Sequence, residues 1–156
     1  MPGEVEFAFR LTGTGWAEGR MAVGNSFVTP TASYLSDALG DLIRAVRGLL
    51  EGAEDARASW EIEPGEYRWI FHRNGSEVRM RLLAFPDMYD HSPDEDGQVL
   101  LDATCSLKAL GLAVAAGAQR VLDEVGIDEY QRRWVEHPYP SDDLAALDQL
   151  LRRDLD

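Results

Sequence analysis

The N-terminal part of the chain alternates between apolar and polar side chains, which is the pattern of a β-strand with one buried face. The alternation is strict over residues 4 to 11. Its apolar face comprises Val5, Phe7, Phe9 and Leu11. Glycines at positions 13 and 15 then indicate a turn. Weaker alternation predicts a second strand over residues 20 to 23 and a third over residues 26 to 29.

Residues 34 to 50 change to the period of a helix. Apolar side chains recur there at spacings of three and four, which predicts an amphipathic helix with one buried stripe. Ser33 or Ser36 would cap its start, and Gly52 would end it. Two glycines, each destabilising in a helix interior, indicate close packing of this helix against a sheet. They are Gly40 and Gly48.

Residues 58 to 85 predict antiparallel strands joined by tight turns. Asn74-Gly75 between alternating runs favours a two-residue hairpin turn, because both central residues of a type I′ turn need positive φ. That turn sets Arg73 opposite Ser76. Counting outward, the inner face pairs residues 71, 69 and 67 with residues 78, 80 and 82, respectively.

A second turn is predicted at the Pro-Gly pair of positions 64 and 65. If it also closes tightly, Trp60 faces Trp69 inside the sheet and Glu61 faces Arg68 outside. A longer loop is the alternative, since turns of types I and II splay tight hairpins.

The C-terminal half predicts one more strand, over residues 98 to 104, followed by helices. The first helix covers residues 107 to 125 and ends at Gly126, which suits the left-handed position after a helix. A capping box over residues 128 to 131 starts a short helix. The last helix begins at Ser141, with acidic residues at its start and arginines near its end, as the helix dipole favours.

This order of elements predicts an α+β fold, an antiparallel β-meander sheet of about five to seven strands with helices packed on one face. A length of 156 residues suits a single globular domain over residues 1 to 156. A hydrophobic content of 45% excludes a disordered chain.

Charge narrows the classes of partner. Acidic side chains number 28 against 15 of Lys and Arg, which gives a net charge of −13. Nucleic-acid binding is not expected. Sequence-independent binding to phosphates relies on Lys and Arg, and in this chain they are outnumbered by acidic residues. An anionic membrane surface would be repelled as well, whereas a basic protein partner would be attracted.

Cysteine content and the N-terminal residues bear on the compartment. The single cysteine, Cys105, permits no intramolecular disulfide. The first ten residues lack the basic and apolar runs of a signal peptide. We therefore expect a cytoplasmic protein.

Residues 86 to 97 form a polar loop that contains no Lys or Arg. Four of its acidic residues are candidates for binding a partner: Asp90, Asp94, Glu95 and Asp96. The acidic groups of this loop would also suit a hard cation such as calcium, but the EF-hand pattern is absent. We expect neither a metal nor a cofactor.

Basic side chains on the predicted outer face of the sheet are the second candidate for partner binding. They are Arg68, His72, Arg79 and Arg81. The alternative is that they pair across strands with Glu61, Glu63 and Glu77, each pair contributing ~0.2 to 1 kcal/mol.

No arrangement of residues typical of a catalytic site is visible. The sequence has no Gly-x-Ser-x-Gly elbow, and Cys105 would be reactive only if a helix N-terminus lowered its thiol pKa. Four tryptophans either pack the core or line an apolar cavity between sheet and helices. They are Trp16, Trp60, Trp69 and Trp134.

The sequence alone does not establish an activity. The leading interpretation is a small acidic protein-binding module, and its concrete form is an immunity-type inhibitor of a basic partner. The alternative is a small-molecule-binding protein or an enzyme that uses His72, His91 or Cys105 in a pocket between sheet and helices. A homodimer that buries one sheet face is a further alternative.

Overall fold

The computed structural model describes residues 4 to 89 and 91 to 155. Strands of the first half form one antiparallel sheet: β1 (Val5–Gly13), β2 (Trp16–Val23), β3 (Ser26–Val28) and β4 (Thr31–Ser33). Strand β2 is central, with β1 along one side and the short strands β3 and β4 along the other.

Helix α1 (Ala38–Leu50) leads into a second antiparallel sheet. Its strands follow the order of the sequence: β5 (Asp55–Ile62), β6 (Gly65–Asn74), β7 (Glu77–Phe85) and β8 (Gln98–Ser106). A one-turn 3₁₀ helix, η1 (Asp94–Asp96), lies in the connection before β8.

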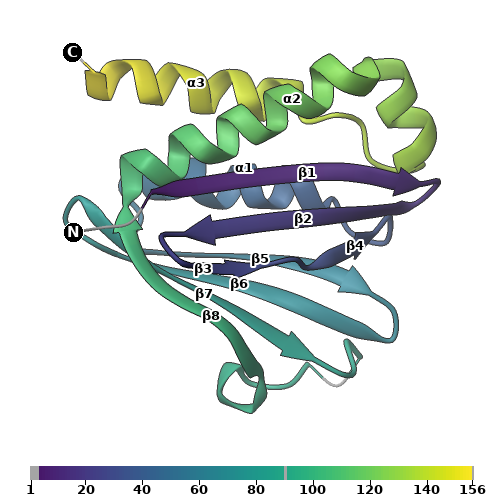
Figure 1. The fold of residues 1–156 in the computed structure, drawn as a ribbon, viewed down its shortest axis with the longest axis horizontal. Coiled ribbons are helices and arrows are strands. Elements are labelled where there is room, and N and C mark those ends of the chain that lie inside the picture. The colour runs from purple at the N-terminus through teal and green to yellow at the C-terminus, as the bar shows by residue number, and fades with distance from the viewer. Residues whose placement is uncertain (1–3, 90, 156) are drawn as a thin grey trace.

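Two further helices follow, α2 (Leu107–Trp134) and α3 (Ser141–Leu155). Figure 1 shows both along one side of the molecule above β1, with α1 behind the strands. Helix α2 is broken at Gly126, whose φ of 78° and ψ of 168° are not helical. The predicted helix end at Gly126 and the separate segment after it are therefore confirmed.

The predicted α+β class is confirmed, and the arrangement of its strands differs from the expectation. The described residues contain eight strands in two sheets of four, where we expected one sheet of about five to seven. Strand β4, of three residues, was not predicted. Helix α1 lies between the two sheets in the chain.

The hairpin of β6 and β7 has the predicted faces but a different register. Asn74 pairs with Glu77, so Gly75 and Ser76 are the central turn residues, and Phe71 lies opposite Met80. Gly75 has φ of +66°. Glycine in the first central position suits a type II′ turn, so this turn was one residue away from the Asn-Gly site. The residue opposite each position thus differs from the predicted one by two. Because side chains alternate between faces, a difference of two keeps every side chain on its predicted face.

The hairpin of β5 and β6 departs from prediction in the same way. Trp60 pairs with Tyr67 rather than Trp69, and Ser59 rather than Glu61 lies opposite Arg68. Residues 63 and 64 form the turn, where proline's missing N–H costs no ladder hydrogen bond.

Helix α1 begins later than predicted, and neither serine caps it. Asp37 is the N-cap residue. Ser33 and Ser36 are buried and instead bind the backbone of Glu61, because β5 passes the start of α1. The glycine prediction also fails: a Cβ on Gly40 would meet the Asp37 carboxylate rather than a sheet, and a Cβ on Gly48 would meet nothing within 4 Å.

An aromatic network fills the space between the sheets and the helices. The rings of Trp60 and Trp69 lie 5.5 Å apart, and Phe9 of β1 lies 5.6 Å from Trp60 and 5.9 Å from Trp134. Trp60 also packs on Gly19 of β2, where a Cβ would lie 2.6 Å from its ring. Three of the four tryptophans are therefore core residues rather than the lining of a cavity.

Candidate functional site

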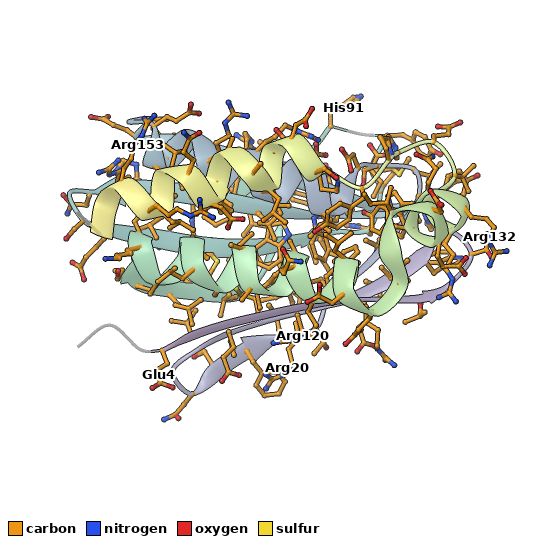
Figure 2. The ribbon with its side chains drawn as sticks, turned by 90° about the horizontal axis from the view of Figure 1, so that it is seen from above. Glu4, Arg20, His91, Arg120, Arg132 and Arg153 are labelled. Carbon is orange, nitrogen blue, oxygen red and sulfur yellow. The ribbon has the colours of Figure 1, made fainter. Side chains whose placement is uncertain are left out.

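An open cleft of about 1010 Å³ lies where α1, β5, β6 and the segment after β7 meet. Its described charged lining comprises Asp41, Arg44, Arg57, Glu61, Glu66, Arg68 and Asp94, with His91 also contributing. Figure 2 shows His91 pointing outward at the periphery, on the side of the molecule away from Arg20 and Arg120. The cleft is thus a charged surface feature rather than an enclosed apolar pocket.

Arg68 connects the acidic loop with the basic outer face of the sheet, which the sequence analysis treated as two separate candidate surfaces. Its guanidinium donates to Asp94 Oδ1 at 2.7 Å and to the Ser92 carbonyl at 2.9 Å. The other terminal nitrogen lies 3.0 Å from Glu66 Oε1, and Arg57 donates to Asp94 at 2.6 Å. The Arg68 side chain is only 11% exposed. One arginine of the basic strip and one aspartate of the acidic loop therefore neutralise each other within the chain.

The acidic segment is packed against the outer face of the second sheet. Ile70, Leu83 and Phe85 form a small buried cluster on that face. A Cβ on Gly97 would lie 2.6 Å from the Phe85 ring, and the Arg68 guanidinium lies 4.0 Å from the centroid of the same ring. Apolar contact and charge together hold this segment in place.

Ion pairing changes the proton affinity of Asp94. Desolvation alone would raise the pKa of this carboxyl, but hydrogen bonds from Arg68 and Arg57 lower it below its ordinary value. Asp94 is therefore ionised at neutral pH and paired with Arg57 and Arg68.

Glu61 has the opposite environment. Its backbone N–H donates to Ser36 Oγ at 3.1 Å, and its carbonyl accepts from Ser33 Oγ at 2.7 Å. Desolvation and the carboxylates of Glu66 and Asp41 raise the pKa of its side chain. Among the described residues, no guanidinium, ammonium or imidazole group pairs with this carboxylate. Glu61 is thus a positioned but uncompensated acid in the cleft.

The other cations of the cleft are occupied. Arg44 donates to Asp37 at 2.8 Å, to Asp41 at 2.6 Å and to Asp143 at 2.9 Å. Burial nevertheless raises the pKa of Asp41, despite its bond to Arg44. Within residues 4 to 89 and 91 to 155, Arg44 is therefore already paired with other acids and makes no ion pair with Glu61.

Tyr89 directly follows Met88, which lines the cleft. Its ring is exposed, with 60% of its surface accessible to solvent. Desolvation raises the pKa of the phenol, and the nearby negative charges, that of Glu63 above all, raise it further. The segment is anchored by the Met88 N–H, which donates to the Pro64 carbonyl at 2.7 Å. Tyr89 is thus an exposed aromatic ring beside acidic groups.

Two of the remaining predicted acids follow Asp94 directly in η1. Glu95 and Asp96 are exposed in η1, and Asp90 lies outside the described residues. Among the described residues, no group of three or more His, Cys, Asp or Glu is arranged to hold a metal ion.

Three of the four residues of the basic strip are paired with acids that the sequence analysis did not choose as their partners. Arg79 makes two hydrogen bonds to Asp102, at 2.9 and 2.7 Å, and His72 lies 2.8 Å from Asp55. Asp102 lies opposite Arg81 on β8. The alternative partners Glu61, Glu63 and Glu77 were wrong, because neighbouring strands and the segment after β7 supply the closer carboxylates.

Two features bear on the remaining functional alternatives. Cys105 is fully buried, and desolvation followed by the charge of Glu77 raises the pKa of its thiol to about 11. Both properties oppose a thiolate nucleophile at this position at neutral pH. None of the helices in the described ranges is long and apolar enough to span a bilayer.

Sequence reasoning missed Asp41 in the cleft lining, Ser36 as a hydrogen-bond partner of the Glu61 backbone, and the exposed Tyr89, which follows the lining residue Met88. Tyr89 left one signal, since it is the single aromatic residue in the acidic stretch from position 86 to position 97. No local pattern indicates that Glu61 stays unpaired, because that depends on which acids the arginines reach.

No protein-family model matches this sequence, and no curated protein matches it. A chain of the solved "CdiA-CT/CdiI toxin and immunity complex from Enterobacter cloacae" has a similar fold, with a TM-score of 0.51 and 10% sequence identity. The match covers 74% of the present chain and 99% of that chain. At this identity the similarity concerns the fold alone.

Proposed function

We propose that this chain is a protein-binding module that acts as an immunity-type inhibitor of a basic partner protein. The observation that carries the proposal is the charge of the cleft. Its described lining holds four carboxylates against three guanidinium groups, in a chain of net charge −13. A basic surface would be attracted over long range and would meet complementary charge on docking.

The fold similarity agrees with this proposal. A chain of a toxin and immunity complex shares the architecture over nearly its whole length. Binding another protein is the activity that the words "toxin and immunity complex" assign to that neighbour, and we carry it to this chain as part of the proposal.

A small-molecule ligand is the second candidate, because the cleft is as large as known ligand sites, which span roughly 300 to 1,000 Å³. Such sites are mostly apolar and bury their ligand. Seven of the fifteen described lining residues are charged, and the cleft opens to solvent. These properties favour a protein surface as the occupant.

The proposal is tested by native mass spectrometry of the tagged chain isolated from its own host, at ~50 mM and then ~300 mM NaCl. We expect a stoichiometric complex with a basic protein at the lower salt concentration and its dissociation at the higher one. The partner is then expressed with and without this chain, and we expect growth to stop only without it. A bare monomer, a homodimer, or a complex with only a small ligand would contradict the proposal.

A further inference from the structure

Three of the four edges of the two sheets are covered or short. An edge strand offers unpaired N–H and C=O groups to any extended chain that approaches it, and proteins usually cover or interrupt such edges. Helix α2 covers β1, because a Cβ on Gly117 would lie 2.6 Å from the Phe7 carbonyl oxygen. Helix α1 packs along β5, where Ser33 and Ser36 bond the carbonyl and the N–H of Glu61. The third edge is divided between β3 and β4, each of three residues.

Strand β8 is the fourth edge, and it is open. It pairs with β7 alone, and β3 approaches it without pairing. Within residues 4 to 89 and 91 to 155, no backbone hydrogen bond joins its outer edge to another element. The strand has nine residues, none of them a lysine or a proline, which are the residues that commonly protect an edge. Figure 1 shows it at the margin of the second sheet, with its start far from α3.

The start of β8 also exposes apolar side chains. Its first three residues are exposed in succession, so the open part of the edge begins there. Leu82 pairs with Leu101 and Leu83 with Val99, so Leu100 forms a β-bulge without a partner on β7. Val99 is 54% exposed and Leu100 is 39% exposed. A strand added at this edge would shield part of this apolar surface from water, which favours binding.

The charges around the edge indicate which kind of strand it would accept. Glu95 and Asp96 are exposed directly before β8, and residues 82 to 107 contain no Lys or Arg. Within β8 the single charged residue is Asp102, which is paired with Arg79 of the neighbouring strand. A second copy of this chain would bring the same acids and a further net charge of −13 to the edge. Charge therefore favours a basic strand from another protein.

We infer that an extended segment of the basic partner protein pairs with β8 and becomes a fifth strand of the second sheet, with basic side chains near Glu95 and Asp96. Backbone hydrogen bonds along the edge supply affinity in this mode of binding, and the side chains supply specificity. The inference rests on the proposed function, because it names the element on which the same partner docks. Asp94 lines the charged cleft and directly precedes Glu95, so η1 links the cleft to the start of β8.

The test uses two fluorescein-labelled peptides and three proteins. One peptide alternates arginine and valine, and its counterpart is N-methylated at every residue, which keeps the side chains and charges but removes the backbone donors. Binding to the full chain is measured by fluorescence anisotropy at ~150 mM NaCl, where distant surface charges are screened. Wild type is compared with Leu100→Lys, which protects the edge, and with Ile127→Lys. Ile127 is 52% exposed on α2, so its substitution adds the same charge elsewhere.

Two further measurements support the comparison. Thermal melting shows that each variant is folded. Amide hydrogen exchange of residues 98 to 106 is followed in the wild type with and without the unmodified peptide, so the test does not depend on the variants alone.

We expect N-methylation and Leu100→Lys each to weaken binding of the arginine-valine peptide about tenfold, and Ile127→Lys less than about twofold. The peptide should slow exchange within residues 98 to 106. Equal binding of the two peptides, equal effects of the two lysine variants, or unchanged exchange would overturn the inference. A wild-type dimer that Leu100→Lys dissociates would also overturn it, because a second copy would then occupy the edge.

Failure of the inference is distinguishable from failure of the proposed function. The peptide results concern β8 alone, and the charged cleft would still hold a basic partner without an added strand. Absence of a basic partner in the native mass spectra defeats the proposed function whatever the peptides do.

Discussion

Glu61 and Glu66 lie directly opposite each other on β5 and β6, so their two carboxylates face the same side of the sheet. Only Glu66 is compensated within the chain, by Ser59 and Arg68. On one side of the cleft, Arg68 is hydrogen-bonded to Glu66 and to the segment after β7, and these bonds hold that segment on the sheet. On the other side, the Glu61 carboxylate has no such partner among the described residues. The two sides respond differently to mutation.

Glu61→Gln should stabilise the fold at neutral pH. A raised carboxyl pKa means that the folded chain binds the proton more tightly than the unfolded chain, so ionised Glu61 opposes folding. The stability advantage of the variant should shrink as pH falls through the raised pKa and vanish below the ordinary value. Urea unfolding at pH 7 and near pH 4 measures this difference. A variant less stable than the wild type at pH 7 would mean that an unrecognised cation compensates Glu61.

Arg68→Ala should destabilise the protein by about 2 to 3 kcal/mol, because it leaves Glu66 and Asp94 close together without their shared cation. The cost stays below that of a fully enclosed pair because the cleft opens to solvent. Arg79→Ala is the control, since its pair with Asp102 is exposed and should leave the urea midpoint nearly unchanged.

Hydrogen exchange locates the effect of the same substitution. Backbone amides of residues 94 to 97 should exchange faster in Arg68→Ala and at the wild-type rate in Arg79→Ala. Equal exchange in the two variants would show that apolar packing of Phe85 against Gly97 alone retains the segment.

Gly117→Ala and Gly48→Ala should change stability in opposite directions. A Cβ at Gly117 would lie 2.6 Å from the Phe7 carbonyl oxygen, so α2 must move away from β1, at a cost of about 1 to 3 kcal/mol. Gly48 has open space around it in the interior of α1, and alanine there should add about 0.5 to 1 kcal/mol. Thermal melting of both variants distinguishes close packing from simple helix propensity.

Cys105 should resist thiol reagents in the native protein. Its side chain is fully buried and its pKa is raised to about 11, so little thiolate forms at pH 8. Reaction with Ellman's reagent should proceed at the rate of unfolding and become immediate in urea. Rapid stoichiometric labelling of the folded chain would contradict the burial of this residue.

Local patterns predicted which faces of the second sheet are buried, and they did not predict its register. Phe71, Trp69 and Met80 all lie in the core as expected, because a shift of two residues leaves the face unchanged. The shift arose in the turns, where Gly75 and not Asn74 takes the positive φ. The two or three residues of a turn are compatible with several turn positions and strand registers, and only the packed structure distinguishes them.

The candidate site was predictable only in part, for a related reason. The sequence analysis selected both Arg68 and Asp94 as candidates, but it placed them on two separate surfaces that would each bind a partner. Their contact joins residues 26 positions apart and depends on the segment after β7 folding back over Phe85. Once Arg68 is bound by Asp94 and Glu66, Glu61 is the acid left over, and no property of its own neighbours in sequence indicates that outcome.

The bonds that hold position 61 are made through its peptide group, and Ser33 and Ser36 would make them with almost any side chain there. Exchange of that side chain would therefore change what the cleft attracts without disturbing the link between β5 and the start of α1. The local architecture would thus persist through a substitution that alters the charge at this point of the cleft.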